Sequence, residues 1–197
     1  SSFDTSNVTD FSYIFSNCKL LKSLNLINFV TSKVASMSHM FNGCTALSSL
    51  YISSFDTSSA TDFSYMFYNC KLLKSLKLTN FVISKVESMS NMFNRCSALK
   101  SLDLSSFDTS NVTDFSYIFS NCTSLQSLNL INFDTSKVTS MSNMFNGCSS
   151  LLSLYISSFD TSSVTDFSYM FYNCSSLQLL NLANFVTSKV TSMSYMF

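Results

Sequence analysis

Seven cysteines recur at an unbroken spacing of 26 residues, and their type and spacing suggest chemistry first. They are Cys18, Cys44, Cys70, Cys96, Cys122, Cys148 and Cys174. If equivalent positions stack about 5 Å apart, as neighbouring strands do, adjacent pairs meet the Cα spacing of a disulfide. The alternative is a buried ladder of free thiols, in which Cys packs as a small apolar residue. We favour the ladder because of this packing role, and because pairing neighbours leaves one of seven over.

The other reactive side chains give little support to metal binding or catalysis. The sequence has no C-x-x-C pair, and its one histidine, His39, cannot complete a Cys-His zinc set. A Ser-His-Asp arrangement would also depend on His39, which shares its repeat position with Tyr and Asn and is interpreted as surface variation. The serines recur at fixed positions and are interpreted as structural. We therefore expect no enzyme, no cofactor and no metal site.

Four asparagines match the acceptor sequence for N-glycosylation. They are Asn7, Asn111, Asn121 and Asn173. Asn7 and Asn111 lie in polar turns and are the better candidates. Asn121 and Asn173 each precede a Cys that we expect to be buried. Modification would also require a eukaryotic secretory route.

Phenylalanine follows the same spacing from Phe3 to Phe185, so the chain holds seven full repeats and fifteen residues of an eighth. Self-similarity of this length indicates a solenoid, a propeller or an array, and a propeller blade usually needs about 40 residues. We therefore expect one coil per repeat. Residues 1–197 form a single solenoid array in this interpretation, starting and ending inside repeats.

Each repeat carries two local patterns. Met37, Met40 and Phe41 have the i, i+3, i+4 spacing of an apolar stripe on a short helix. The pattern L-x-x-L-x-L, which ends at Leu128 and Leu130 in one repeat, alternates with the period of a strand. The fold class expected is an α/β leucine-rich-repeat-like solenoid, with short parallel strands on one face and short helices on the other.

Charge and composition exclude several classes of partner. Eleven Lys and Arg balance eleven Asp and Glu, so the basic excess that a duplex nucleic-acid binder needs is missing. A hydrophobic content of 46% is enough to build a core. No apolar run approaches the ~20 residues of a membrane-spanning helix. We expect no nucleic-acid partner and no membrane span in this segment.

A second period of 52 residues governs the charged residues. At one repeat position, Asp in the odd-numbered repeats alternates with Ser in the even-numbered repeats. At another position, Lys in the even-numbered repeats alternates with Asn or Ser in the odd-numbered repeats. The two sets are Asp10, Asp62, Asp114 and Asp166, and Lys33, Lys85, Lys137 and Lys189. Alternation separates like charges to about one Debye length, which relieves repulsion between stacked repeats. Alternatively, alternate repeats face different partners.

The outward positions of the predicted strands form a candidate binding face. Leucine-rich horseshoes bind partners on their concave sheet, although these residues also suit an ordinary solvated surface. The candidates are Lys22, Tyr51, Lys74, Lys77, Lys100, Asp103 and Tyr155.

The unit M-x-x-M-F-x-x-C-x-x-L-x-x-L-x-L-x-x-F-x-T-S, seen in residues 89–110, recurs along the chain. It resembles the BspA-like leucine-rich-repeat surface proteins of the bacterial lipoprotein and protist surface type. The resemblance covers all 197 residues. It implies an extracellular or surface-attached, non-enzymatic solenoid with a role in adhesion or envelope structure.

We therefore expect a structural surface protein, a segment of a long array, filament or surface coat. Its partner would be a second copy, meeting it end to end or side by side. The alternative is a discrete adhesin that binds a host or matrix protein or glycan through the strand face.

Overall fold

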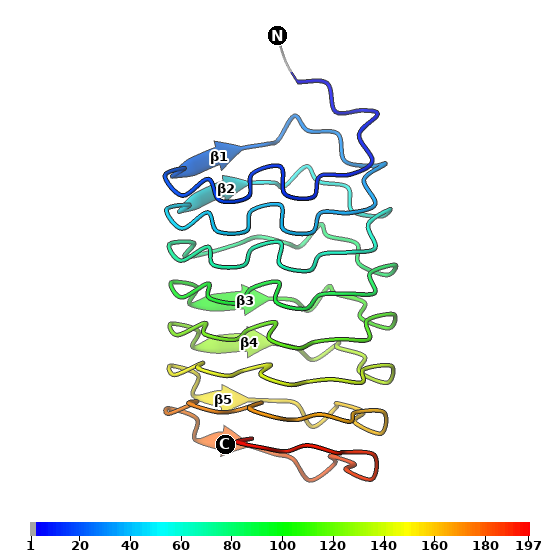
Figure 1. The fold of residues 1–197 in the computed structure, drawn as a ribbon, viewed down its shortest axis with the longest axis vertical. Helices are drawn as coiled ribbons and strands as arrows, with labels where there is room; N and C mark the ends of the chain where they lie inside the picture. Colours follow the sequence, from blue (N-terminus) through cyan, green and yellow to red (C-terminus); the bar gives the residue numbers. More distant parts are fainter. Residues whose placement is uncertain (1–2) are drawn as a thin grey trace.

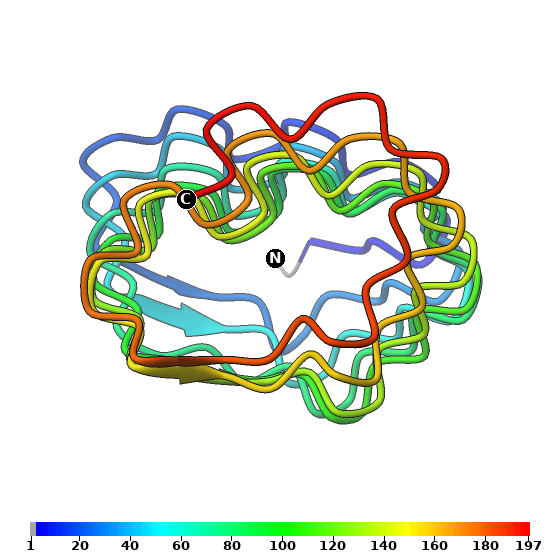
Figure 2. The same ribbon diagram turned by 90° about the horizontal axis from the view of Figure 1, so that it is seen from below.

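The computed structural model describes residues 3–197, which wind into a stack of coils along one long axis (Figure 1). Each coil is one 26-residue repeat, from coil 1 (residues 1–26) to the partial coil 8 (residues 183–197). Viewed along the stack, the coils superimpose on one oval outline (Figure 2). The expected repeat solenoid is confirmed. Ser1 and Ser2, which belong to the expected array, lie outside the described residues.

Short parallel strands form one side of the stack, as predicted. They are β1 (Ser23–Asn25), β2 (Ser49–Tyr51), β3 (Ser101–Asp103), β4 (Ser127–Asn129), β5 (Ser153–Leu154) and β6 (Leu179–Leu180). They pair in parallel as β1–β2, β3–β4 and β5–β6, each residue beside its equivalent 26 residues later. In coil 3 residues 75–77 form no strand, and β4 and β5 of the consecutive coils 5 and 6 do not pair, so three separate two-stranded sheets result. We call this side, residues 74–78 in coil 3 and their equivalents, the strand wall.

The expected short helices are wrong: residues 3–197 contain no helix, and therefore none that could cross a membrane. Residues 37–41 instead form consecutive turns, the first closed by the Met40 N–H bonding the Met37 carbonyl at 3.2 Å. Its third residue, His39, has a φ of 57°, which a type II turn requires and a right-handed helix excludes. Positive φ returns at Gly43. The i, i+3, i+4 spacing marks the buried corners of these turns.

Between these turns the backbone bonds sideways to the next coil. The Tyr65 N–H, for example, donates to the Ser90 carbonyl at 3.0 Å. Single parallel bridges link equivalent residues of all eight coils, from Asp10 to Ser192, without a break. We call this side, residues 62–70 in coil 3 and their equivalents, the turn wall.

Aromatic rings from the turn wall stack through the core. The ladder begins at Phe15 and ends at Phe197, with one Phe from each coil. Phe119 is fully buried, and its ring centroid lies 5.8 Å from that of Phe93 and 5.7 Å from that of Phe145. Stacking buries area that one coil cannot bury alone, so stability belongs to the array.

Buried threonines join the coils at the third edge, residues 53–61 in coil 3, which we call the connecting edge. The Thr57 hydroxyl donates to the Val82 carbonyl and accepts the Val82 N–H, both at 2.8 Å. One hydroxyl thus satisfies both backbone groups of a residue in the next coil. Coil 4 carries Ile83 at this position and has no such hydroxyl.

Candidate surface sites

The cysteine column is a set of free thiols that lines the core. The Cys96 thiol donates to the Phe67 carbonyl at 3.1 Å, and five other cysteines make the same contact with the preceding coil. Burial raises the pKa of Cys96 to about 12, so this thiol stays protonated and unreactive at neutral pH. The expected burial is wrong for Cys18, which is exposed in the first coil described, and Cys174 is only half-buried. The buried members are Cys44, Cys70, Cys96, Cys122 and Cys148.

His39 lies in an aromatic stack on the turn wall. Its ring is sandwiched between Tyr13 and Tyr65, at centroid distances of 4.4 and 4.5 Å. Its Nδ1 atom is buried without a hydrogen-bond partner. Burial lowers the pKa of His39, and the Asp62 carboxylate partly opposes this shift. The stack gives His39 a packing role that sequence reasoning missed.

The carboxylates mostly serve the backbone. Asp10 accepts the Ser12 N–H at 2.7 Å, and hydrogen bonding from the Ser12 side chain and backbone lowers the pKa of Asp10. Asp103, a candidate of the strand face, caps a turn in the same way by accepting the Ser105 N–H at 3.0 Å. Within residues 3–197, no three His, Cys, Asp or Glu side chains gather closely enough to hold a metal ion.

The seven strand-face candidates all lie exposed, but the structure does not gather them into one site. Tyr51 and Lys77 line a groove of about 420 Å³. Tyr155 lines a separate groove of about 390 Å³ further along the stack. Lys22, Lys74, Lys100 and Asp103 line neither groove.

The four glycosylation candidates differ in accessibility. Asn111 is half-buried, and its amide donates to the Ser84 carbonyl at 2.7 Å, so a glycan there would break a contact between coils. Asn7, Asn121 and Asn173 are exposed. Their modification stays a prediction.

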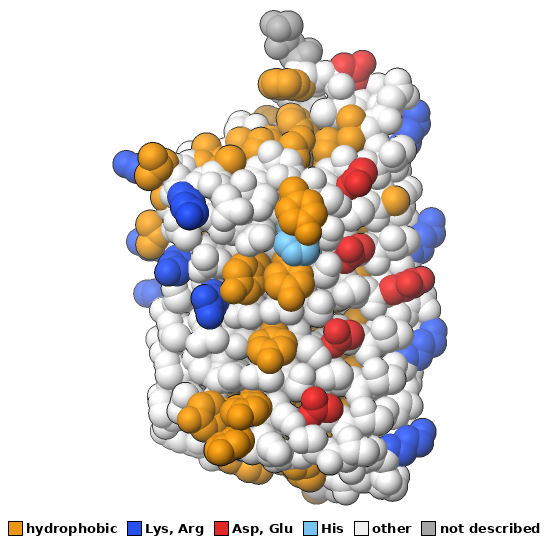
Figure 3. Space-filling model, in the orientation of Figure 1, with side chains coloured by type: hydrophobic (Ala, Val, Ile, Leu, Met, Phe, Trp, Pro, Cys, Tyr) orange, Lys and Arg blue, Asp and Glu red, His pale blue; other side chains and the backbone are white. Residues whose placement is uncertain are grey.

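Two charged columns follow the 52-residue period on one side of the molecule. Acidic side chains run down the turn wall, and lysines run down the edge beside them (Figure 3). The Asp column is Asp10, Asp62, Asp114 and Asp166, exposed or half-buried, and the Lys column is Lys33, Lys85, Lys137 and Lys189, all exposed. Lys85, Lys137 and Glu87 also line a groove of about 560 Å³.

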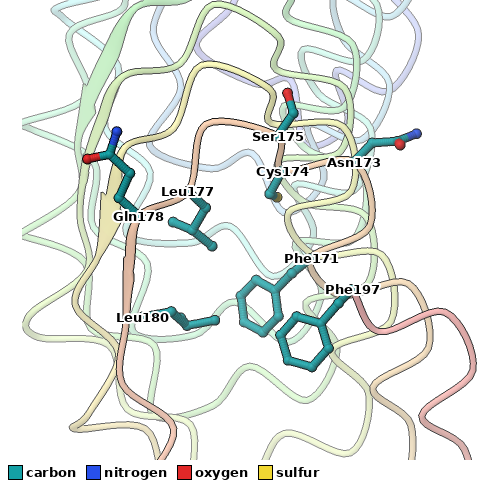
Figure 4. Close-up of a pocket in the computed structure, with 8 residues that line it drawn as sticks. All are labelled: Phe171, Asn173, Cys174, Ser175, Leu177, Gln178, Leu180 and Phe197. Carbon is teal, nitrogen blue, oxygen red and sulfur yellow. The ribbon is translucent and has the colours of Figure 1, made fainter.

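A cavity of about 520 Å³ lies at the coil 7 end of the stack (Figure 4). Phe171, Leu177, Leu180 and Phe197 contribute to its lining. The equivalent Phe145 and Leu151 are buried beneath coil 7. The cavity is therefore formed by the same positions at which the preceding coils stack on one another.

A family model described as "Mycoplasma protein of unknown function, DUF285" matches residues 1–102, 51–129 and 115–197. The chain belongs to the DUF285 family. No curated protein matches this DUF285 chain significantly.

Solved structures similar to this DUF285 chain are leucine-rich repeat proteins, as the resemblance of the repeat unit predicts. The leucine-rich repeat protein of T. pallidum is 18% identical to this chain with a TM-score of 0.41, and the match covers 85% of this chain and 70% of that protein. The leucine-rich repeat protein of Eubacterium ventriosum is 15% identical with a TM-score of 0.43, and the match covers 88% of this chain and 60% of that protein. A leucine rich cell surface protein of Faecalibacterium prausnitzii is 19% identical with a TM-score of 0.30, over 86% and 62%. These values are too low to transfer a function.

Sequence reasoning missed the serines of the strand-wall groove in this DUF285 chain. Serine is so frequent that no single one stands out, and only the register of coils 2 and 3 brings these hydroxyls together. They are Ser48, Ser49, Ser53 and Ser75.

Proposed function

We propose that this DUF285 chain is a non-enzymatic structural protein of the cell surface, a stiff rod within a longer array or filament. One observation carries the proposal: the ladders between coils run without interruption through the described stack. The backbone bridges extend from Asp10 to Ser192 and the Phe ladder from Phe15 to Phe197. A rod is what such a one-dimensional arrangement builds.

The repeated interface supports an array role because each coil offers its neighbours nearly the same contacts. Further coils of this type can be added without a new design, each extending the rod by about 4.8 Å. A pair of coils, the 52-residue unit, would add about 9.6 Å. The length of the rod is then set by the number of repeats.

An extracellular setting agrees with the chemistry of the thiols. Cys70, Cys122 and Cys148 are buried, and burial raises the pKa of each well above its usual value. Only thiolates react readily with oxidants, so the core thiols would survive outside the cell. The resemblance of the repeat unit to surface proteins points the same way.

Negative-stain electron microscopy of the native full-length protein, under non-reducing conditions, tests this role. We expect long uniform fibres or a continuous coat. Discrete short rods would contradict the filament and favour the adhesin. A hydrolytic activity lost on His39→Ala would contradict the non-enzymatic assignment.

The adhesin is a second candidate, favoured by the groove on the strand wall. Tyr51 offers a phenol, Lys77 a cation and the surrounding serines hydroxyls, a mixture suited to a glycan or a polar protein surface. A glycan array screened with the chain tests it. Binding lost in Tyr51→Ala and kept in Tyr155→Ala would place the ligand in this groove.

A further inference from the structure

The Lys column and the Asp column share one period but occupy different coils. Lys lies in coils 2, 4, 6 and 8, and Asp in coils 1, 3, 5 and 7. Threonine separates the two columns along most of the chain, as Thr113 does beside Asp114. Both columns are visible on the same side of the molecule (Figure 3).

Members of both columns hydrogen-bond to neutral groups of their own chain, and Lys137 and Lys189 also interact electrostatically with Asp134 and Asp160. The Lys137 ammonium donates to Asn111 Oδ1 of the preceding coil at 2.7 Å. Asp114 accepts the Ser116 N–H at 2.7 Å. An ammonium has three donors and a carboxylate about four acceptor sites, so both groups keep capacity for a further partner.

The alternation needs an explanation beyond repulsion within one column. Spacing the aspartates two coils apart relieves their mutual repulsion, but it leaves the lysines free to occupy any coils. Their restriction to the coils without a member of the Asp column is explained if a second surface with the same period must fit both columns. The chain itself carries that surface.

A two-fold rotation about an axis parallel to the stack, placed between the columns, sets the Lys column of one copy opposite the Asp column of another. An offset of one coil then brings the opposite charges level. Four lysines of one copy meet four aspartates of its partner, and three of the reciprocal pairs also form. An antiparallel arrangement would place the Lys column against the Lys column and the Asp column against the Asp column, so opposite charges would not face each other directly.

We propose that two copies of this chain pair side by side, in parallel and offset by one coil, through the Lys and Asp columns. The proposal rests on the structural function and names its lateral partner. The formal net charge of zero means that no overall repulsion opposes the association. Since the pairs lie at a surface, salt weakens the association.

Sedimentation velocity over a concentration series tests the pairing. We expect a salt-sensitive monomer–dimer equilibrium, weakened about tenfold or more when either column loses its charge. The two test variants change every Lys of the Lys column to Gln, or every Asp of the Asp column to Asn. Asn keeps an acceptor for the turn, and thermal melts check folding.

A matched control removes three other aspartates from the same odd coils. Each accepts the N–H of the Ser two residues later, as the members of the Asp column do, but they lie outside that column. Changing them to Asn should leave the dimer unchanged. The control residues are Asp4, Asp56 and Asp108.

A monomeric wild-type chain at about 1 mM, or equal weakening in the control, would overturn the pairing. The rod itself would still stand, since microscopy tests that separately. Carbodiimide coupling in a mixture of light and heavy isotope-labelled chains tests orientation. We expect Lys85 of one copy joined to Asp62 or Asp114 of the other. Cross-links between Lys33 of one copy and Asp166 of the other would show the antiparallel arrangement and contradict the proposal.

Discussion

The turn wall and the strand wall join the same coils in different ways. On the turn wall, bridges between equivalent residues continue from Asp10 to Ser192, and the Phe ladder runs beneath them. On the strand wall, six strands of two or three residues form three sheets that are not joined to one another. The segment with strand periodicity is therefore the less continuous side. The turns hold the stack together along its full length.

The difference follows from backbone conformation. Positive φ recurs at two turn-wall residues of each of coils 1 to 7, such as Tyr65 and Asn69. Each reversal closes a turn within the coil while alternate N–H groups still point to the next coil. A wall built this way pairs with its neighbours over more residues than a three-residue strand does. Continuity does not require long strands.

Shortening a ring of the Phe ladder should have the largest effect on stability. Phe119→Ala removes a fully buried ring stacked on both sides, and we expect a loss of about 3–5 kcal/mol of unfolding free energy. Leu128→Ala in β4 removes a half-buried side chain and should cost about 1–2 kcal/mol. Urea unfolding measures both. A larger loss at Leu128 would reverse the ranking of the walls.

A hydroxyl of the connecting edge should matter less. Thr57→Val leaves the Val82 N–H and carbonyl without their partner, and we expect a loss of about 1–2 kcal/mol. Ile83→Thr tests the same contact in the opposite direction. If coil 4 accepts a hydroxyl there, the chain gains stability in the same urea assay. A neutral Thr57→Val would show that water replaces the bond.

Replacing a glycine at a left-handed position of the turn wall should destabilise the chain. Gly147 has a φ of +73°, and an added Cβ would lie 2.9 Å from Asn121 Oδ1. We expect Gly147→Ala to cost about 1–2 kcal/mol, mainly through backbone strain. Adding Asn121→Ala removes the contact and should recover only part of the loss. Full recovery in thermal melts would assign the cost to the contact alone.

The smallest effect should come from His39 on titration. Burial lowers its folded-state pKa below the unfolded value of about 6.5. Its stabilisation is therefore present above about pH 6.5 and lost as the pH falls through the folded pKa. Urea midpoints at about pH 5.5 and 7.5 measure the loss. His39→Asn, which places the residue found at Asn91, should remove this dependence, and an unchanged dependence would assign it elsewhere.

The sequence predicts the strand wall in six coils because burial and local period agree there, but in coil 3 the same pattern at Leu73, Leu76 and Leu78 forms no strand. Ser101–Asp103 in β3 lies where L-x-x-L-x-L alternates. The same reasoning failed on the turn wall, because i, i+3, i+4 spacing fits a helix and a run of turns equally. Asn69 and Gly43 at one repeat position were a usable signal for positive φ. Tyr65 gave none, because bulky residues rarely adopt that conformation.

The candidate surface sites also divide into features that the sequence predicts and features that it does not. Exposure of the strand-face residues follows from alternation, so Tyr51 and Lys77 could be chosen from sequence. The groove between them depends on serines from two coils, and the bond from Thr57 to Val82 depends on the register of coils 3 and 4. Register between coils is a tertiary property that a single repeat does not encode.

Native-state hydrogen exchange tests the contrast between the two walls most directly. Coil 3 allows the comparison within one repeat: the N–H groups of Tyr65 and Phe67 bond coil 4 at 3.0 and 2.9 Å, whereas residues 75–77 form no strand. We expect the Tyr65 and Phe67 amides to exchange only through global unfolding, and those of Leu76 and Lys77 to exchange much faster through local opening. Slower exchange at Leu76 and Lys77 than at Tyr65 and Phe67 would show that the strand wall, not the turn wall, holds the coils together.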